Sequence, residues 1–160
     1  MVGSALVIGI GNPDRGDDRA GRAVARLLRE TPPPGVEIVE HDGEATSLMA
    51  CFDGAGAVWL IDASSSSSPP GTVRRFDATA APLPAGEVGV SSHGLGVSEA
   101  IELARALGTL PARCVVYAIE GASFEAGAPL SPEVAAAVAE VGRRVLAEIA
   151  ETGRSLPAGD

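Results

Sequence analysis

The residues of this chain that are best suited to chemistry are carboxylates and one histidine that lie next to predicted strands and helices. They are Asp17, Asp18, Asp42, Asp62, His93 and Glu120. A parallel sheet would bring most of them to one edge, because the carboxyl ends of its strands lie together. Two carboxylates and one imidazole at that edge could ligate a borderline divalent metal such as nickel or zinc, and a carboxylate could also act on a proton.

The loop that carries Asp17 and Asp18 joins a short apolar strand to a helix. The strand is indicated by the apolar run 6–10, and the loop after it turns at glycine. The helix is indicated by apolar residues at i, i+3, i+4, i+7 and i+8 from Ala20 to Leu28. Since loops at the carboxyl ends of strands form the ligand site of open α/β sheets, this carboxylate pair is expected at such a site.

Each candidate also has a structural interpretation. Asp17 or Asp18 is expected to cap the following helix, and His41 is expected to be structural. Turn, strand-end or surface roles stay open for the other candidates, which are Asp42, Asp62, His93 and Glu120. Spacing alone therefore does not separate a metal or catalytic site from a set of structural side chains.

A dinucleotide-binding fold begins with the same order of strand, glycine loop and helix. Its fingerprint G-x-G-x-x-G needs a third glycine where this chain has Asp14. Acidic side chains at the loop would also repel a pyrophosphate. The sequence contains no lysine, which excludes both a P-loop lysine and a Schiff-base lysine. The nucleotide-binding interpretation is therefore disfavoured.

Strand and helix signals alternate along the rest of the chain. Further strands are predicted at 36–39, 57–61 and 114–119, and further helices at 48–52, 97–107 and 132–149. The runs 57–61 and 114–119 are apolar throughout, as expected for strands that are covered on both faces. This pattern predicts an α/β protein with a three-layer α/β/α sandwich.

Three segments are predicted to lie outside this core. The serine run 64–68 is predicted to be an exposed loop. The segment 72–76 is predicted to be an edge strand whose arginines face water. The segment 78–89 is rich in proline, alanine and glycine, and we expect a mobile loop that contacts substrate.

Length, charge and cysteine usage limit the class of protein. The 160 residues are predicted to form a single domain, with an ordered core over about 5–150 and a flexible tail at 151–160. The formal net charge of -9 disfavours nucleic acid and anionic membranes as partners. Without an apolar run of membrane-spanning length or a basic leader, the cytoplasm is the expected location. Cys51 and Cys114 are expected to act as small hydrophobic residues in a reducing compartment.

Several short motifs, in a fixed order over about residues 5–150, give a more specific indication. They are GIGN (9–12) with GDD (16–18), IDA (61–63), SHGLG (92–96), and IEG (119–121) followed by Phe124, Gly127 and LSPEV (130–134). In these segments the chain resembles the [NiFe]-hydrogenase maturation endopeptidases. Motifs that occur together in register are far more specific than any one of them.

The resemblance implies an endopeptidase that removes a short C-terminal extension from the hydrogenase large-subunit precursor once nickel has been inserted. The family's three metal-contacting positions fall on Asp18, Asp62 and His93, and Asp42 falls on a further position in the loop after the second strand. There the family's D-G-G-T reads DGEAT (42–46), so that Glu44 and one extra residue depart from it. The resemblance also implies a monomer and a five-stranded, mostly parallel sheet with one antiparallel strand.

Three protein ligands make an incomplete metal site, so nickel would come from the precursor and the resting enzyme would be metal-free. Nickel could polarise the scissile carbonyl while a carboxylate acts as base. Alternatively, the carboxylates alone could carry out the chemistry, as in an aspartic-type protease, with nickel only as a recognition signal. Two other classes also stay open: an independent metal-dependent hydrolase of small amides or peptides with its own zinc, and a non-catalytic nickel-sensing chaperone.

Overall fold

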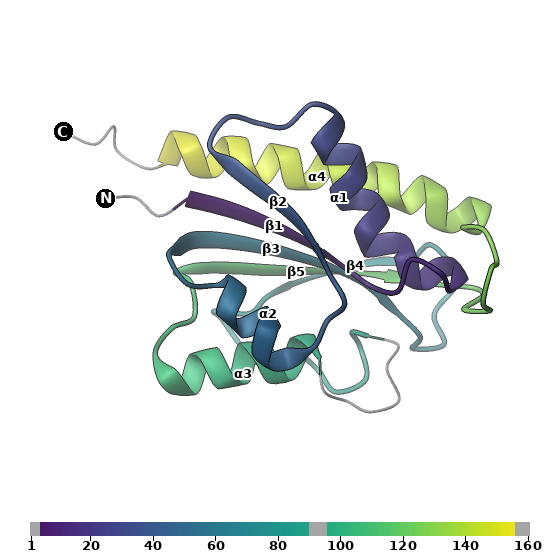
Figure 1. Ribbon diagram of the computed structural model, residues 1–160, viewed down its shortest axis with the longest axis horizontal. Helices are drawn as coiled ribbons and strands as arrows, with labels where there is room; N and C mark the ends of the chain where they lie inside the picture. The colour runs from purple at the N-terminus through teal and green to yellow at the C-terminus, as the bar shows by residue number, and fades with distance from the viewer. Residues whose placement is uncertain (1–3, 90–95, 156–160) are drawn as a thin grey trace.

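The computed structural model describes residues 4–89 and 96–155 (Figure 1). The strands are β1 (Ser4–Ile10), β2 (Val36–His41), β3 (Ala55–Ser64), β4 (Val73–Asp77) and β5 (Arg113–Glu120). The helices are α1 (Ala20–Glu30), α2 (Ala45–Cys51), α3 (Val97–Leu107) and α4 (Pro132–Ser155), with the short 3-10 helix η1 (Gly16–Arg19) directly before α1.

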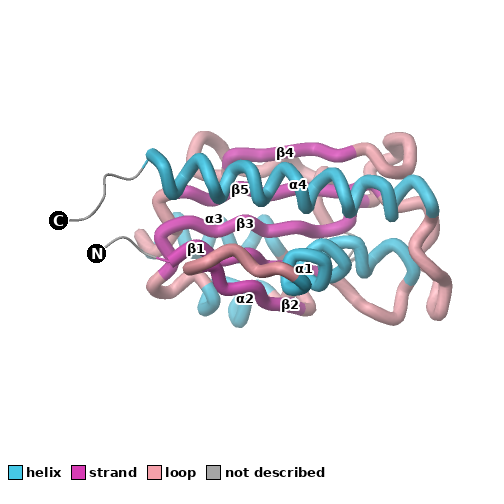
Figure 2. Tube along the Cα trace, turned by 90° about the horizontal axis from the view of Figure 1, so that it is seen from above, coloured by secondary structure: helices cyan, strands magenta, loops and turns pink. Residues whose placement is uncertain are grey.

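The strands form one sheet in the order β2-β1-β3-β5-β4. Neighbouring strands pair in parallel except β4, which pairs antiparallel with β5. Helices α1 and α4 cover one face of the sheet, and α2 and α3 cover the other (Figures 1 and 2). This arrangement confirms the predicted three-layer α/β/α sandwich and its five-stranded, mostly parallel sheet with one antiparallel strand.

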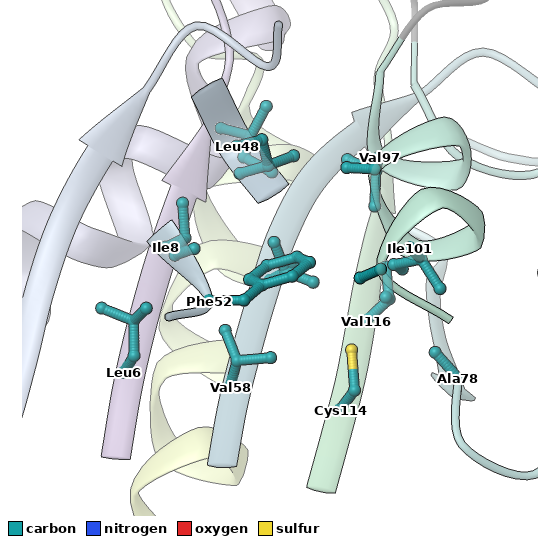
Figure 3. Close-up of a cluster of buried hydrophobic side chains, with 14 of the residues drawn as sticks. Leu6, Ile8, Leu48, Phe52, Val58, Ala78, Val97, Ile101, Cys114 and Val116 are labelled. Carbon is teal, nitrogen blue, oxygen red and sulfur yellow. The ribbon is translucent and has the colours of Figure 1, made fainter. Parts of the chain in front are cut away.

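Side chains that alternate along the buried strands supply two cores. On β1, Ile8 packs toward α2 and α3, whereas Val7 packs toward α1 and α4. Figure 3 shows the first of these cores, where Leu48 of α2 and Ile101 of α3 lie over the sheet. The central strands β3 and β5 are buried on both faces along most of their length, as their apolar runs predict.

Helix α1 approaches the sheet closely because glycines lie at the contact. A Cβ atom on Gly9 of β1 would lie 2.3 Å from the carbonyl oxygen of Gly21, and a Cβ atom on Gly21 would lie 2.1 Å from that of Ile61. Both distances are far shorter than van der Waals contact, so only glycine fits at these two positions. The contact places the first turn of α1 directly against the ends of β1 and β3.

Two strands extend beyond their apolar runs. Strand β3 continues to Ser64, which is 2% exposed, so Asp62 lies within the strand rather than after it. Strand β5 likewise includes Glu120 as its last residue. The prediction of an exposed serine loop is therefore wrong for Ser64, although Ser65 and Ser67 are exposed.

Strand β4 is an edge strand, as predicted, and Arg75 is exposed, as expected, whereas Arg74 is partly buried. Arg74 donates a hydrogen bond to Ser66 Oγ at 2.8 Å and pairs with Glu87. Arg75 pairs with Glu148 of α4 at 2.6 Å. Both guanidinium groups find partners because one faces the loop after β3 and the other faces α4.

The segment 78–89 contains no helix or strand, yet it packs against the rest of the protein. Ala78 is fully buried, and its N–H donates to the carbonyl oxygen of Cys114 at 2.8 Å. Leu83 and Val88 pack against the core that lies under α2 and α3. Shortening this segment would therefore remove core contacts, and its mobility and contact with substrate stay predictions.

Helix α4 begins directly after Ser131, as predicted, and continues to Ser155, into the segment predicted as a tail. Over the described ranges 4–89 and 96–155, no helix is long and apolar enough to cross a membrane.

The glycine contact gives the first testable prediction. The substitution Gly21→Ala should lower the free energy of unfolding by about 1–3 kcal/mol or more, because the added methyl meets backbone atoms that cannot rotate away. Urea denaturation measures this loss. The matched control is Gly153→Ala in α4, where a Cβ atom would meet nothing within 4 Å, so stability should be unchanged or raised. Equal stability of Gly21→Ala and the unaltered protein would contradict the close contact.

Candidate active site

The strand order of the sheet reverses beside β1, and two predicted site carboxylates lie at this reversal. From β1 the chain continues to β2 on one side, whereas β3 lies on the other side of β1. Open α/β sheets bind ligands at such a switch point, outside the carboxyl ends of the strands. Asp18 lies in η1, which follows β1, and Asp62 lies near the carboxyl end of β3.

The carboxyl group of Asp62 is almost enclosed by protein, since the residue is only 6% exposed. Its Oδ1 accepts a hydrogen bond from the N–H of Ala63 at 2.8 Å. Burial and, to a smaller extent, the negative charge of Asp18 raise the pKa of Asp62 to about 8, against the opposing effect of the Ala63 hydrogen bond. Its surroundings therefore favour the protonated form of Asp62 in the free protein.

Asp18 is half-buried, and its Oδ2 accepts a hydrogen bond from the N–H of Asn12 at 3.2 Å. Burial raises the pKa of Asp18, and the Asn12 hydrogen bond and the charges of Arg15 and Arg22 oppose part of this rise. Burial and mutual repulsion both disfavour a fully ionised pair of carboxylates. A divalent cation beside the pair would reverse both effects, so these side chains fit a metal ligand set.

The third predicted ligand, His93, lies outside the described residues. Within 4–89 and 96–155, no three His, Cys, Asp or Glu side chains gather as a metal site. Asp18 and Asp62 are the part of the predicted set that the structure describes near one another, since the charge of Asp18 contributes to the raised pKa of Asp62.

Asp42 lies directly after β2, at the same edge of the sheet, and its side chain is 76% exposed. Its Oδ1 accepts a hydrogen bond from the N–H of Glu44 at 3.0 Å, which forms a turn around Gly43. Among the described residues, the contacts of Asp42 lie within its own loop, and the structure does not bring it against Asp18 or Asp62.

The departure of Glu44 from the family pattern has a structural explanation. Its carboxylate accepts hydrogen bonds from the N–H groups of Ser47 at 2.8 Å and Thr46 at 3.0 Å and so caps α2. These hydrogen bonds lower the pKa of Glu44 to about 2. The expectation that His41 is structural also agrees with the geometry, because its Nδ1 accepts from the Gly43 N–H at 2.8 Å and its Nε2 lies 3.2 Å from Ser47 Oγ.

Asp17 is fully buried and holds the loop after β5. Its Oδ2 accepts hydrogen bonds from the N–H groups of Ala122 at 2.7 Å and Ser123 at 3.0 Å and from Ser131 Oγ at 2.8 Å, while its Oδ1 accepts from the Ser131 N–H at 2.7 Å. Burial raises the pKa of Asp17, but these hydrogen bonds outweigh it, and the pKa lies below its ordinary value. The expectation that Asp17 or Asp18 caps the following helix is wrong, because neither η1 nor α1 has a side-chain cap.

Backbone contacts join the same two loops. The N–H of Asp17 donates to the Ser123 carbonyl at 2.8 Å, and the N–H of Gly127 donates to the Asp14 carbonyl at 2.8 Å. The loop that carries Asp18 is therefore fixed by a segment about 105 residues later in the chain.

Glu120, for which a solvated strand end was considered, is instead 3% exposed and hydrogen-bonded. It accepts from Ser64 Oγ at 3.2 Å, from Ser66 Oγ at 2.6 Å and from the Ser66 N–H at 3.0 Å. Glu120 thus orders the loop that follows β3 and Asp62.

Two surface hollows lie away from the carboxylate pair. One of about 510 Å³ lies between α1 and α4, and one of about 450 Å³ lies between α2 and α3. Neither is lined by Asp18 or Asp62. The site is therefore identified by its chemistry and its place in the sheet.

The four hydrogen bonds of Asp17 lead to a prediction for stability and its pH dependence. The substitution Asp17→Asn leaves one acceptor oxygen for donors that need two, and should lower the free energy of unfolding by about 1–3 kcal/mol at pH 7. Because the pKa of Asp17 is lowered in the folded state, its contribution is present above the unfolded pKa and is lost as pH falls through the folded value. Urea unfolding at a series of pH values measures this loss. The difference in free energy of unfolding between the unaltered protein and Asp17→Asn should become smaller below about pH 4.

The matched control is Asp14→Asn, which makes the same change at an exposed position of the same loop. It should leave stability almost unchanged. Equal losses for the two variants, or a difference that does not vary with pH, would contradict the role assigned to Asp17.

Comparisons with known proteins were made against families, curated proteins and solved structures. The chain matches the family model described as hydrogenase maturation protease (HycI) over residues 22–148. No curated protein matches it. Its structure is similar to that of the hydrogenase maturating endopeptidase HybD from E. coli, with 26% identity, 94% of each chain covered and a TM-score of 0.79.

Two further solved structures are similar over almost the whole chain. An endopeptidase from Escherichia coli has 25% identity, 94% of each chain covered and a TM-score of 0.81. The [NiFe] hydrogenase maturation protease HybD from Thermococcus kodakarensis has 26% identity and a TM-score of 0.66, with 93% of this chain and 97% of that chain covered. Since the family match spans most of the sequence and the fold agrees, the chain belongs to the hydrogenase maturation protease family.

Proposed function

We propose that this endopeptidase removes the C-terminal extension of a nickel-loaded [NiFe]-hydrogenase large-subunit precursor. Membership of the maturation protease family supports the reaction. The observation that carries the site assignment is the buried Asp62 beside Asp18 at the switch point of the sheet. A carboxyl group kept from water and next to a like charge is typical of a functional site.

Asp18, Asp62 and His93 are the residues that would contact nickel, which arrives as part of the precursor. When bound, the ion supplies positive charge that polarises a carbonyl group and favours ionised carboxylates. Three protein ligands leave room for ligands of the precursor. Cleavage would then depend on a precursor that already contains the metal.

The two carboxyl groups differ in the protonation state that their surroundings favour. The surroundings of Asp62 favour its protonated form, which can donate a proton, whereas Asp18 lies closer to solvent and near two arginines. Asp18 is therefore the better base for an attacking water, and Asp62 the better acid, if the carboxylates alone carry out the chemistry. We assign Asp42, which is exposed at the same edge, a contact with the precursor that assists catalysis.

We further propose that the protein acts as a monomer in the cytoplasm. Its two free cysteines, Cys51 and Cys114, suit a reducing compartment.

Carboxamide variants test the carboxylate pair. Asp18→Asn and Asp62→Asn should each lower kcat/KM for cleavage of the nickel-loaded precursor by about 100-fold or more. Their free energies of unfolding should be unchanged or raised, because Asp18→Asn removes a negative charge beside the buried Asp62, and Asp62→Asn replaces a buried carboxyl group whose surroundings already favour the neutral form. The shift of the large subunit on a denaturing gel reports cleavage, and urea denaturation reports stability.

Asp14→Asn serves again as the control and should cleave at the unaltered rate. Asp42→Asn should lower cleavage without a change in stability, because its side chain is exposed. Cleavage by Asp62→Asn at the rate of the unaltered protein would rule out the proposed site.

Metal content gives a separate prediction. Protein treated with a chelator and then dialysed should be folded and free of metal, and should still cleave a precursor that contains nickel. Elemental analysis and circular dichroism check the first part, and the cleavage assay checks the second. Stoichiometric zinc that survives the treatment, together with no cleavage, would instead indicate an independent metallohydrolase.

A further inference from the structure

The side chains of Arg74 and Glu87 form an ion pair between β4 and the end of the segment 78–89. We propose that Arg74 and Glu87 are positioning residues, which hold Gly89 against the part of β3 that carries Asp62. The effect on cleavage rests on the function proposed above. The effect on Gly89 concerns the free protein alone.

The position of Arg74 depends on hydrogen bonds that begin at a buried carboxylate. Glu120 is 3% exposed and fixes Ser66 by accepting hydrogen bonds from its hydroxyl at 2.6 Å and from its N–H at 3.0 Å. Ser66 Oγ in turn accepts a hydrogen bond from Arg74 at 2.8 Å. The other terminal nitrogen of Arg74 donates to Ser68 Oγ. These hydrogen bonds fix the orientation of the Arg74 guanidinium, which in turn positions the carboxylate of Glu87.

Two residues after Glu87, the main chain meets β3. The N–H of Gly89 donates to the carbonyl oxygen of Ala63 at 2.9 Å, and Gly89 forms an isolated parallel bridge with Ser64. A Cβ atom on Gly89 would lie 3.7 Å from Oδ2 of Asp62. Gly89 therefore borders Oδ2 of that carboxyl group, the oxygen that does not accept the Ala63 hydrogen bond.

The ion pair suits a local role better than a role in global stability. The side chains of Arg74 and Glu87 are 30% and 34% exposed, and ion pairs with this much exposure add little to the free energy of unfolding. Their loss would instead free residues 87–89, which among the described residues are joined to β3 by one backbone hydrogen bond, that of Gly89. The position of the main chain beside the Asp62 carboxyl group would then vary from molecule to molecule.

The test compares Glu87→Gln with Glu140→Gln, a control that removes the same charge from an exposed pair with Arg143 on α4. Hydrogen exchange of the Gly89 amide, followed by NMR in the free protein, should become at least about tenfold faster in Glu87→Gln only. With nickel-loaded precursor, kcat should fall by about tenfold to 100-fold while KM stays within about twofold. The urea midpoint should match that of the unaltered protein.

The variant Arg74→Gln should reproduce both effects, and the double variant Arg74→Gln/Glu87→Gln should be no worse than either single variant, because the pair acts as a unit. Unchanged exchange at Gly89 would overturn the assigned contact. Faster exchange at Gly89 with unchanged kcat would overturn the positioning role and leave the endopeptidase function intact. If the unaltered protein does not cleave the precursor, the proposed function fails, and with it the positioning role in cleavage, while the exchange experiment still decides whether the pair holds Gly89.

Discussion

The contact between the backbone of α1 and the backbone of the sheet determines where the site can be. Gly9 and Gly21 let the helix approach until the added atoms of any other residue would overlap with carbonyl oxygens. The helix therefore begins directly at the ends of β1 and β3. Asp18, in the turn before the helix, is brought near Asp62 as a consequence.

A close helix alone would not fix the loop from Gly11 to Asp18. The carboxylate of Asp17 supplies the second constraint, because its four hydrogen bonds run to the segment between β5 and α4. The adjacent residues Asp17 and Asp18 thus lie in opposite electrostatic surroundings. Asp17 is surrounded by donors that stabilise its charge, whereas Asp18 and Asp62 lie where burial and repulsion destabilise charge.

The elements were predictable from the sequence where one local pattern decides them. Helical periodicity located α1 and α3, Ser131 and Pro132 marked the start of α4, and continuous apolar runs located β3 and β5. Asp18 and Asp62 were candidates for the site from the sequence, because strand ends and family motifs both indicate them. The partners of Asp17, Arg74 and Glu120 were not predictable, because each lies in a segment that is distant in the chain or that has low complexity. A solvated Glu120 and a solvent-facing Arg74 were reasonable from local spacing, but tertiary contacts bury Glu120 and partly bury Arg74, whereas Arg75 is exposed as expected.

Repulsion within the carboxylate pair also bears on turnover. On the proposed mechanism, the precursor's metal ion relieves this repulsion while the uncut precursor is bound. On the same mechanism, the unfavourable interaction would return once the metal ion leaves the pair with the cleaved large subunit. The pair would then not retain the ion after cleavage, so that a single enzyme molecule could serve many precursors. Side chains that bound a metal ion of their own tightly would instead keep that ion after cleavage.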